Sequence, residues 1–167
     1  GNGAFGDVWL VKKGGKKYAL KVQTINMRIL SDLSDLYMRL ENELEKSELL
    51  GKHGIGPKVL DYYMCTDGNT VNVILIMEYM NYGTLDTYLE VHALTESNKQ
   101  DILAKMTKMH KLGIIHGDIH ERNILVKKKG KKFHFYLGDF GFSKNFNQIK
   151  KHKKQVDLES LEYIIDN

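Results

Sequence analysis

The pattern of apolar and polar residues predicts two β-hairpins in the first half of the chain. Residues 8–11 and 18–22 are short apolar runs of strand length, and the lysine-rich segment between them contains two glycines. Residues 59–65 and 71–79 form a second pair, and the polar residues that separate them are typical of a tight turn. We therefore expect two antiparallel strand pairs ahead of residue 80.

Helical periodicity appears in two longer segments. Residues 31–50 carry apolar side chains at spacings of three and four, as an amphipathic helix requires, at Leu33, Leu36, Tyr37, Leu40 and Leu44. Ser97 is predicted to cap a second helix, because Gln100 follows three residues later in a capping-box pattern. Gly113 is predicted to end that helix. The methionines and isoleucine inside it are expected to pack in the core.

Candidate chemistry gathers in the segment His116–Asn123, which reads HGDIHERN, and in the later Gly-Asp-Phe-Gly that contains Asp139. Asp118 can orient an attacking hydroxyl or accept its proton. Asn123 and Asp139 offer hard oxygen ligands for Mg²⁺ beside the phosphates of ATP. The two motifs occur in order with a strand-like run between them, so they indicate phosphoryl transfer.

The chain opens with Gly1, Gly3 and Gly6 in the order GNGAFGDV. Glycines at this spacing let the backbone approach phosphates closely and present N–H donors to them. Dinucleotide-binding turns use the same spacing, but they need a strand before the glycines and a helix after them. The residues that follow here are strand-like. We therefore expect a hairpin over the phosphates, with Lys21 on its second strand.

In this order the motifs resemble those of the protein kinase-like superfamily, with HGDxxxxN standing where most members have HRDxxxxN. The resemblance implies an α+β, bilobal fold. It implies one domain over residues 1–167, with a β-rich N-lobe at 1–79 that holds one helix and a shortened helical C-lobe at 80–167. It also implies transfer of a phosphoryl group from ATP, assisted by Mg²⁺, to serine or threonine hydroxyls of proteins.

The resemblance requires a carboxylate that holds Lys21. The candidates on the predicted helix, which otherwise face solvent, are Glu41, Glu43, Glu45 and Glu48. We choose Glu43, because it precedes Gly54 by 11 residues and the small kinases of the KEOPS complex place the paired glutamate at a similar distance from a Gly-Ile/Val turn. The predicted catalytic residues are then Asp118, Lys21 and Glu43, and the predicted metal ligands are Asn123 and Asp139.

Residues 77–80, Met-Glu-Tyr-Met, resemble the hinge between the two lobes of kinases. The resemblance places Met77 at the gatekeeper position and the backbone of Glu78 and Met80 against the adenine. Thr84 or Asp86 would then meet the ribose. The complete predicted ATP-binding set is Gly1, Gly3, Gly6, Val8, Ala19, Lys21, Met77, Glu78, Met80, Thr84 and Asp86.

Two departures from the common kinase pattern predict constitutive activity. Gly117 replaces an arginine that pairs with an activation-loop phosphate in regulated kinases. Asp157 follows Asp139 by only 18 positions, and Ser143 is the only hydroxyl-bearing residue between the Phe-Gly and Asp157. Residues 155–162 resemble the helix of the KEOPS-associated kinases in which an aspartate braces the catalytic loop.

Three alternatives to protein phosphorylation stay open. The HGDxH pattern, with His120, also resembles aminoglycoside and choline phosphotransferases and favours a small-molecule acceptor. The likeness to KEOPS-associated kinases implies ATP hydrolysis in support of a partner. A pseudokinase that binds partners without turnover is the third, although the complete set of motif residues favours an enzyme.

Composition indicates the cellular compartment and the kind of genome that we expect for this protein. The chain has 167 residues, a formal net charge of +4 and one cysteine, which excludes an intrachain disulfide and favours an intracellular compartment, cytoplasmic or nuclear. No apolar run approaches the roughly 18 residues of a membrane span, so no membrane partner is expected. Many Lys, Asn, Ile and Tyr with a single Pro are typical of an AT-rich genome, such as that of a large DNA virus. Compared with kinases, the sequence is expected to be truncated at both ends.

Two lysine runs concentrate the positive charge. Residues 127–132 lie between two strand-like runs and are expected to form a solvated hairpin tip. Lys150–Lys154 lies where kinases place their substrate platform, so it is a candidate site for an acidic partner, or a solvated loop. A protein substrate is the expected partner, and a nucleic acid is the less favoured one.

Overall fold

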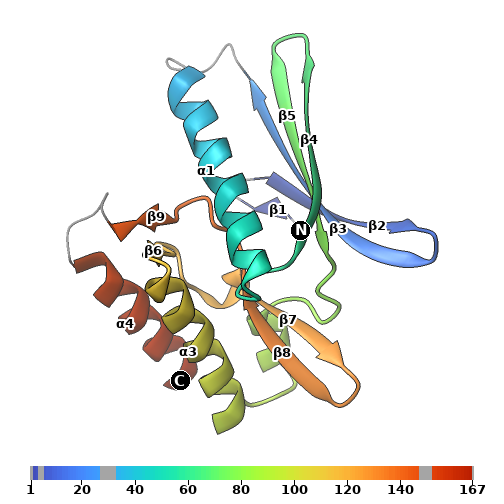
Figure 1. Cartoon of the computed structure of the whole chain (residues 1–167). Coiled ribbons are helices and arrows are strands. Elements are labelled where there is room, and N and C mark those ends of the chain that lie inside the picture. Colours follow the sequence, from blue (N-terminus) through green and yellow to red (C-terminus); the bar gives the residue numbers. More distant parts are fainter. Residues whose placement is uncertain (1, 4–5, 27–32, 147–151, 167) are drawn as a thin grey trace.

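A five-stranded antiparallel sheet forms the first half of the computed structural model, which describes residues 2–3, 6–26, 33–146 and 152–166 (Figure 1). The strand order is β1-β2-β3-β5-β4. The strands are β1 Asn2–Gly3, β2 Gly6–Lys13, β3 Lys16–Asn26, β4 Val59–Asp67 and β5 Thr70–Glu78. Both predicted hairpins are confirmed. The first closes through Gly14 and Gly15, whose φ angles of 56° and 74° are accessible at low cost only to glycine.

Helix α1, Leu33–Lys52, packs across one face of this sheet (Figure 1). Alternate residues of β5 point toward it, because successive side chains of a strand face opposite sides. The buried cluster consists of Leu40, Val71, Val73 and Leu75, with Leu44, Val59 and Met77 packed against it. Glu43 lies within the part of α1 that this apolar contact fixes on the sheet.

The second half of the chain is mainly helical around its own core. Its elements are α2 Leu85–Leu89, α3 Glu96–Lys111, β6 Ile114–Ile115, η1 Glu121–Asn123, β7 Ile124–Lys129, β8 Lys132–Leu137, β9 Lys144–Asn145 and α4 His152–Asp166. Strands β7 and β8 form one antiparallel pair, and β6 and β9 form another. Apolar side chains of α3 and α4 meet there, among them Ile102, Met106, Met109, Leu161 and Ile164.

The predicted cap of the helix near residue 97 is wrong. Helix α3 begins at Glu96, and its N-cap is Thr95, whose side chain accepts a hydrogen bond from the Asn98 backbone N–H at 3.2 Å. Ser97 is therefore inside the first turn. Gln100 donates to Glu96 at 3.3 Å, one helical turn away. Two hydroxyl residues two positions apart gave equally plausible caps, and the backbone of Thr95 is the one in the extended conformation that an N-cap needs.

The predicted α+β class is confirmed by this arrangement of a sheet, helices and small hairpins. No helix within the described residues is long and apolar enough to cross a membrane. Strand β5 ends at Glu78, and the chain then runs through residues 79–84 into α2. This connection, together with α1 and the loop between β8 and β9, brings the motif residues of the two halves together.

Candidate active site

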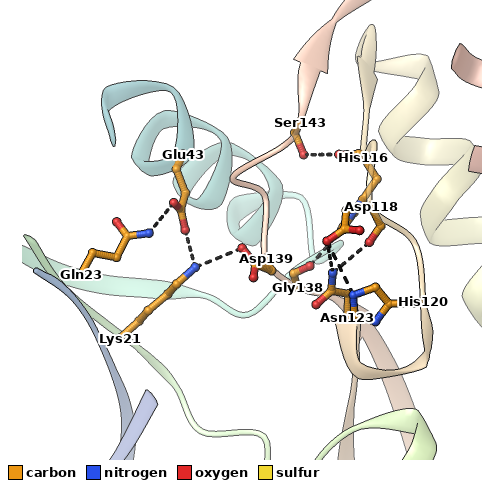
Figure 2. Close-up of polar contacts among 10 residues, drawn as sticks. All are labelled: Lys21, Gln23, Glu43, His116, Asp118, His120, Asn123, Gly138, Asp139 and Ser143. Carbon is orange, nitrogen blue, oxygen red and sulfur yellow. Dashed lines mark hydrogen bonds and ion pairs between the residues drawn. The ribbon is translucent and has the colours of Figure 1, made fainter. Parts of the chain in front are cut away.

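Lys21 of β3 lies between two carboxylates at the junction of the two halves (Figure 2). Its Nζ is 2.5 Å from Glu43 Oε1 and 3.1 Å from Asp139 Oδ1. The predicted pairing of Lys21 with Glu43 is confirmed. Asp139 comes from the Gly-Asp-Phe-Gly motif, 118 residues away in sequence, so a single ammonium group links the sheet, α1 and the second half of the chain.

The charge of Lys21 is maintained by these partners. Burial disfavours its ammonium form, but the Glu43 and Asp139 carboxylates outweigh that effect and hold the pKa of Lys21 above its ordinary value of 10.5. Gln23 supports the arrangement, because its Nε2 donates to the second Glu43 oxygen at 2.7 Å. Gln23 was not among the predicted site residues, although its position two residues after Lys21 on a strand indicates the same face.

The Asp118 carboxylate is oriented by Asn123 (Figure 2). Asn123 Nδ2 donates to the Asp118 backbone carbonyl at 2.9 Å and to Asp118 Oδ2 at 3.1 Å. Both amide hydrogens of Asn123 are thereby used, so its amide oxygen is the group left for another ligand. His120 Nε2 lies 3.6 Å from Asp118 Oδ2, which puts an imidazole beside the same carboxylate.

His116 holds the two motifs together. Its side chain is fully buried, and its Nε2 donates to the Gly138 carbonyl at 2.9 Å, directly before Asp139. Its ring also meets Phe140 edge-on at 5.5 Å between centroids. Burial lowers the pKa of His116 below 6.5, although the bond to Gly138 opposes this. The imidazole is therefore neutral, which fits a buried Nδ1 without a hydrogen-bond partner among the described residues.

Asp157 of α4 braces the backbone ahead of Asp118, as the resemblance implied. Asp157 Oδ2 accepts from the His116 N–H at 2.7 Å, and Oδ1 accepts from the Gly117 N–H at 2.9 Å. His110 Nε2 donates to Oδ2 at 3.0 Å. Burial would raise the pKa of Asp157, but these three donors outweigh burial and hold it below 3.8. His110 was predicted only as a helix residue and not as a member of this network.

Helix α1 is also tied directly to the segment after Phe140. Asn42 Nδ2 donates to the Ser143 backbone carbonyl at 3.1 Å, and the side-chain oxygen Oδ1 of Asn42 accepts from the buried Lys46 ammonium. Ser143 is 1% exposed, and its hydroxyl donates to the His116 carbonyl at 3.2 Å. These bonds connect the turn of α1 that carries Glu43 with the loop that carries Asp118.

The predicted nucleotide-binding residues lie along one face of the sheet and the connection that follows it. Strand pairing places Val8 opposite Lys21 and Ala19 opposite Met77, and the period of two puts all four on the α1 side. Gly3 pairs with Gly6 across β1 and β2, whereas Gly1 lies outside the described residues.

The residues predicted to meet adenine and ribose lie at and beyond the end of β5. The Glu78 N–H donates to the Lys58 carbonyl at 2.9 Å, and the Glu78 carboxylate pairs with Lys127. Met80 is buried. The Thr84 hydroxyl donates to the Asp86 carboxylate at the start of α2.

A metal ion would need oxygen atoms from a bound ligand here. Within the described part of the chain, no group of three His, Cys, Asp or Glu side chains could hold a metal. The Asn123 amide oxygen and the Asp139 carboxylate are the available hard donors, and Mg²⁺ characteristically combines one or two such groups with phosphate oxygens. The residues present therefore fit a magnesium–nucleotide complex.

The cluster Lys150–Lys154 is only partly described. Lys150 and Lys151 lie outside the described residues, and the side chains of residues 152 and 153 are likewise not described. Lys154 is exposed, and its ammonium lies 5.8 Å from the centre of the Phe146 ring. The acidic partner predicted for this cluster stays a prediction.

The sequence of this chain is similar to those of known proteins. The family described as protein kinase domain matches residues 1–164. The serine/threonine-protein kinase ppk35 of Schizosaccharomyces pombe is 30% identical over 148 residues, which are 86% of this chain and 22% of that protein. Human serine/threonine-protein kinase greatwall is 32% identical over 149 residues, which are 85% of this chain and 16% of greatwall.

A third relative, the serine/threonine-protein kinase ppk31 of Schizosaccharomyces pombe, is 30% identical over 167 residues, 96% of this chain and 15% of its own length. The chain thus spans less than a quarter of each of these relatives. The matched region nevertheless contains the Gly-rich loop, Lys21, Glu43, Asp118, Asn123 and Asp139. The chain belongs to the protein kinase domain family.

Proposed function

We propose that this chain transfers the γ-phosphoryl group of ATP to serine or threonine hydroxyls of proteins. The observation that carries the proposal is the assembly of Lys21, Glu43 and Asp139 in one ion-paired group, with Asp118 and Asn123 hydrogen-bonded nearby. Similarity to three serine/threonine-protein kinases supports the choice of acceptor.

In the proposed reaction, the acceptor oxygen forms a bond to the γ-phosphorus while the bond from that phosphorus to the β,γ-bridging oxygen breaks, and ADP leaves. Asp118 orients the acceptor hydroxyl and takes its proton. Asn123 fixes the Asp118 carboxylate through the 3.1 Å hydrogen bond. A carboxylate held in this way loses little orientational freedom at the transition state.

Lys21 would hold the α- and β-phosphates, with Glu43 and Gln23 keeping its side chain extended toward them. Glu78 would meet the adenine through its carbonyl oxygen, because its N–H is already bonded to Lys58. Met80 would supply the neighbouring N–H. Mg²⁺, held by Asn123 and Asp139, would neutralise phosphate charge as the phosphoryl group moves.

Replacement of the Asp118 carboxylate tests whether the chain is an enzyme. Asp118→Asn should lower kcat by about 10²–10⁴-fold, because a positioned proton acceptor is lost, and should leave ATP affinity nearly unchanged. Steady-state kinetics and nucleotide titration would measure the two quantities. The control is Asp67→Asn, an exposed aspartate at the end of β4. Equal activity of the wild type and Asp118→Asn would exclude the mechanism and favour a pseudokinase.

A second assay identifies the acceptor. We expect purified chain and γ-labelled ATP to label protein substrates, including the chain itself, on serine or threonine. Parallel reactions contain a panel of aminoglycosides and amino alcohols, and a third set measures free phosphate. Label on small alcohols and never on protein would replace our choice with a small-molecule phosphotransferase. Release of phosphate without any labelled acceptor would replace it with an ATPase.

A further inference from the structure

Two lysine-rich hairpin tips flank the connection that follows β5. The first is the turn of β2–β3, with Lys12, Lys13, Lys16 and Lys17, and the second is the turn of β7–β8, with Lys128, Lys129, Lys131 and Lys132. All eight side chains are exposed. We propose that these eight lysines, here called the basic surface, bind the phosphate backbone of a nucleic acid.

The tertiary structure brings the two tips to one side of the molecule. In Figure 1 both turns project toward the right-hand side, one from each half of the chain. The Lys17 ammonium lies 5.8 Å from the centre of the Tyr79 ring, and the Lys128 ammonium lies 5.7 Å from that of Tyr82. Since Tyr79 and Tyr82 are three residues apart, both tips rest against the same short segment.

The second tip is anchored to that segment by further contacts. Asn81 accepts from the Lys128 N–H at 2.8 Å and donates to the Lys128 carbonyl at 3.1 Å. The Lys128 ammonium also lies 5.2 Å from the centre of the Phe133 ring. The Glu78 carboxylate pairs with Lys127. These contacts fix the β7–β8 hairpin beside the connection and leave the eight lysines of the basic surface facing outward.

The positive charge of the basic surface is not compensated locally. Neither tip contains an acidic residue, and none of the eight ammonium groups forms an ion pair within the described residues. Without these eight lysines the formal net charge of the chain would change from +4 to −4. These two hairpins therefore present a concentrated and exposed positive charge. Such a field attracts a polyanion and orients it during approach.

A nucleic acid fits this surface better than an acidic peptide does. Exposed lysines around glycine turns present point charges, which suit a dense and regular array of anionic groups. Double-stranded DNA presents one charge per about 1.7 Å and releases counterions when lysines neutralise it, which gives affinity without a pocket. The tips contain no arginine, asparagine or glutamine, and their lysines are expected to contact phosphates, which carry no sequence information, so binding should be independent of sequence.

Fluorescence anisotropy with a labelled DNA duplex of about 20 bp tests the proposal on the full chain. For four to six phosphate contacts, the affinity should fall by about 10²–10³-fold between 50 and 200 mM salt. Lys→Gln substitution of all four lysines at either tip should reduce the slope of log K against log salt by at least two units. Lys→Arg substitution at all eight positions should retain binding, because the charge is kept.

The matched control is a quadruple variant that removes the same charge from α1 and α3, K52Q/K99Q/K108Q/K111Q. It should change the salt slope by less than one unit, and thermal unfolding should show that every variant is folded. Equal weakening by this control and by the tip variants would overturn the proposal, since net charge alone would explain binding. Displacement of the duplex by a polyglutamate peptide of equal charge at lower concentration than unlabelled DNA would also overturn it.

Discussion

Gly117 shows how local backbone geometry restricts the residue beside the candidate catalytic aspartate. Its φ angle is 82°, and a Cβ atom there would lie 2.9 Å from the Phe142 carbonyl oxygen. Any L-residue would therefore be strained and would also collide with backbone. In this backbone conformation the position therefore favours glycine over the arginine that regulated kinases carry.

His116 should make the free energy of unfolding depend on pH. The buried imidazole has a lowered pKa, so the unfolded chain binds a proton more readily than the folded chain. Stability is therefore fully present above the ordinary pKa of 6.5 and is lost as pH falls below it. Between pH 7.5 and 5.5, the wild type should lose roughly 1 kcal/mol more than His116→Gln does. Denaturant unfolding at both pH values measures this difference.

The other six histidines are unchanged in His116→Gln, so their titration affects the wild type and the variant equally and cancels in the comparison. His116→Gln should be less stable than the wild type at pH 7.5, because the bond to Gly138 is altered. The pH dependence of the difference isolates the titration of His116. If the difference in free energy of unfolding between the two proteins is the same at both pH values, the prediction of a neutral, buried imidazole is contradicted.

At the scale of elements, hydrogen bonds of Asn42 connect α1 to the segment after Phe140. Asn42 spans from α1 to the Ser143 carbonyl, and the buried Lys46 ammonium fixes the orientation of the Asn42 amide. The Ser143 hydroxyl continues the path to His116. Constitutive activity stays a prediction, and this connection is one route by which α1 could be positioned beside Lys21.

Asn42→Ala tests this connection. The change leaves the Ser143 carbonyl and the Lys46 ammonium without this partner, which should lower the free energy of unfolding by about 1–3 kcal/mol. We expect kcat/KM to fall by about tenfold, a change of about 1.4 kcal/mol in the barrier. The control is Glu41→Gln, which alters an exposed side chain of the same helix and should stay within twofold.

A double variant distinguishes positioning from general destabilisation. If Asn42 acts through Glu43, Asn42→Ala should cost much less activity when Glu43 is already glutamine, since contributions that share one path are not additive. Thermal unfolding of the same variants measures the loss of stability separately. A full tenfold loss in both backgrounds would show that Asn42 does not act through Glu43.

At the scale of the whole molecule, Asp157 connects α3, α4 and the loop that carries Asp118. Its side chain is 2% exposed and accepts three hydrogen bonds. Asp157→Asn removes the charge and turns one acceptor into a donor that faces a backbone N–H. We expect a loss of about 3 kcal/mol, since buried groups become unsatisfied. For a chain of this size, the melting temperature should fall by about 10 °C.

Asp166→Asn on the same helix is the matched control. Asp166 is 71% exposed and pairs with Lys99 at 3.4 Å, so its removal should change stability by less than about 0.5 kcal/mol. Calorimetry of the two variants at pH 7 compares a buried and an exposed aspartate in one element. Equal melting temperatures for Asp157→Asn and the wild type would mean that the brace does not stabilise the fold.

Local sequence determined most of the elements and the order of the motifs. Apolar runs separated by glycine turns were sufficient for both N-terminal hairpins, because strand length and turn chemistry depend on neighbouring residues. The HGDxxxxN and Asp-Phe-Gly patterns likewise indicated Asp118, Asn123 and Asp139, of which Asp139 reaches Lys21. The predicted cap of α3 was wrong, because Thr95 and Ser97 offer similar chemistry and only the backbone conformation distinguishes them.

Tertiary structure alone decided which distant side chains share a hydrogen-bond network. Gln23 reaches Glu43, Asn42 reaches Ser143 and His110 reaches Asp157. No periodicity in the sequence specifies these pairs, since each depends on how a helix is rotated and placed by the apolar residues that it buries. The same packing brings Lys17 and Lys128, 111 residues apart in sequence, against one connecting segment. Composition determined the amount of positive charge on this protein, and the fold determined that two of its lysine-rich turns lie beside that segment.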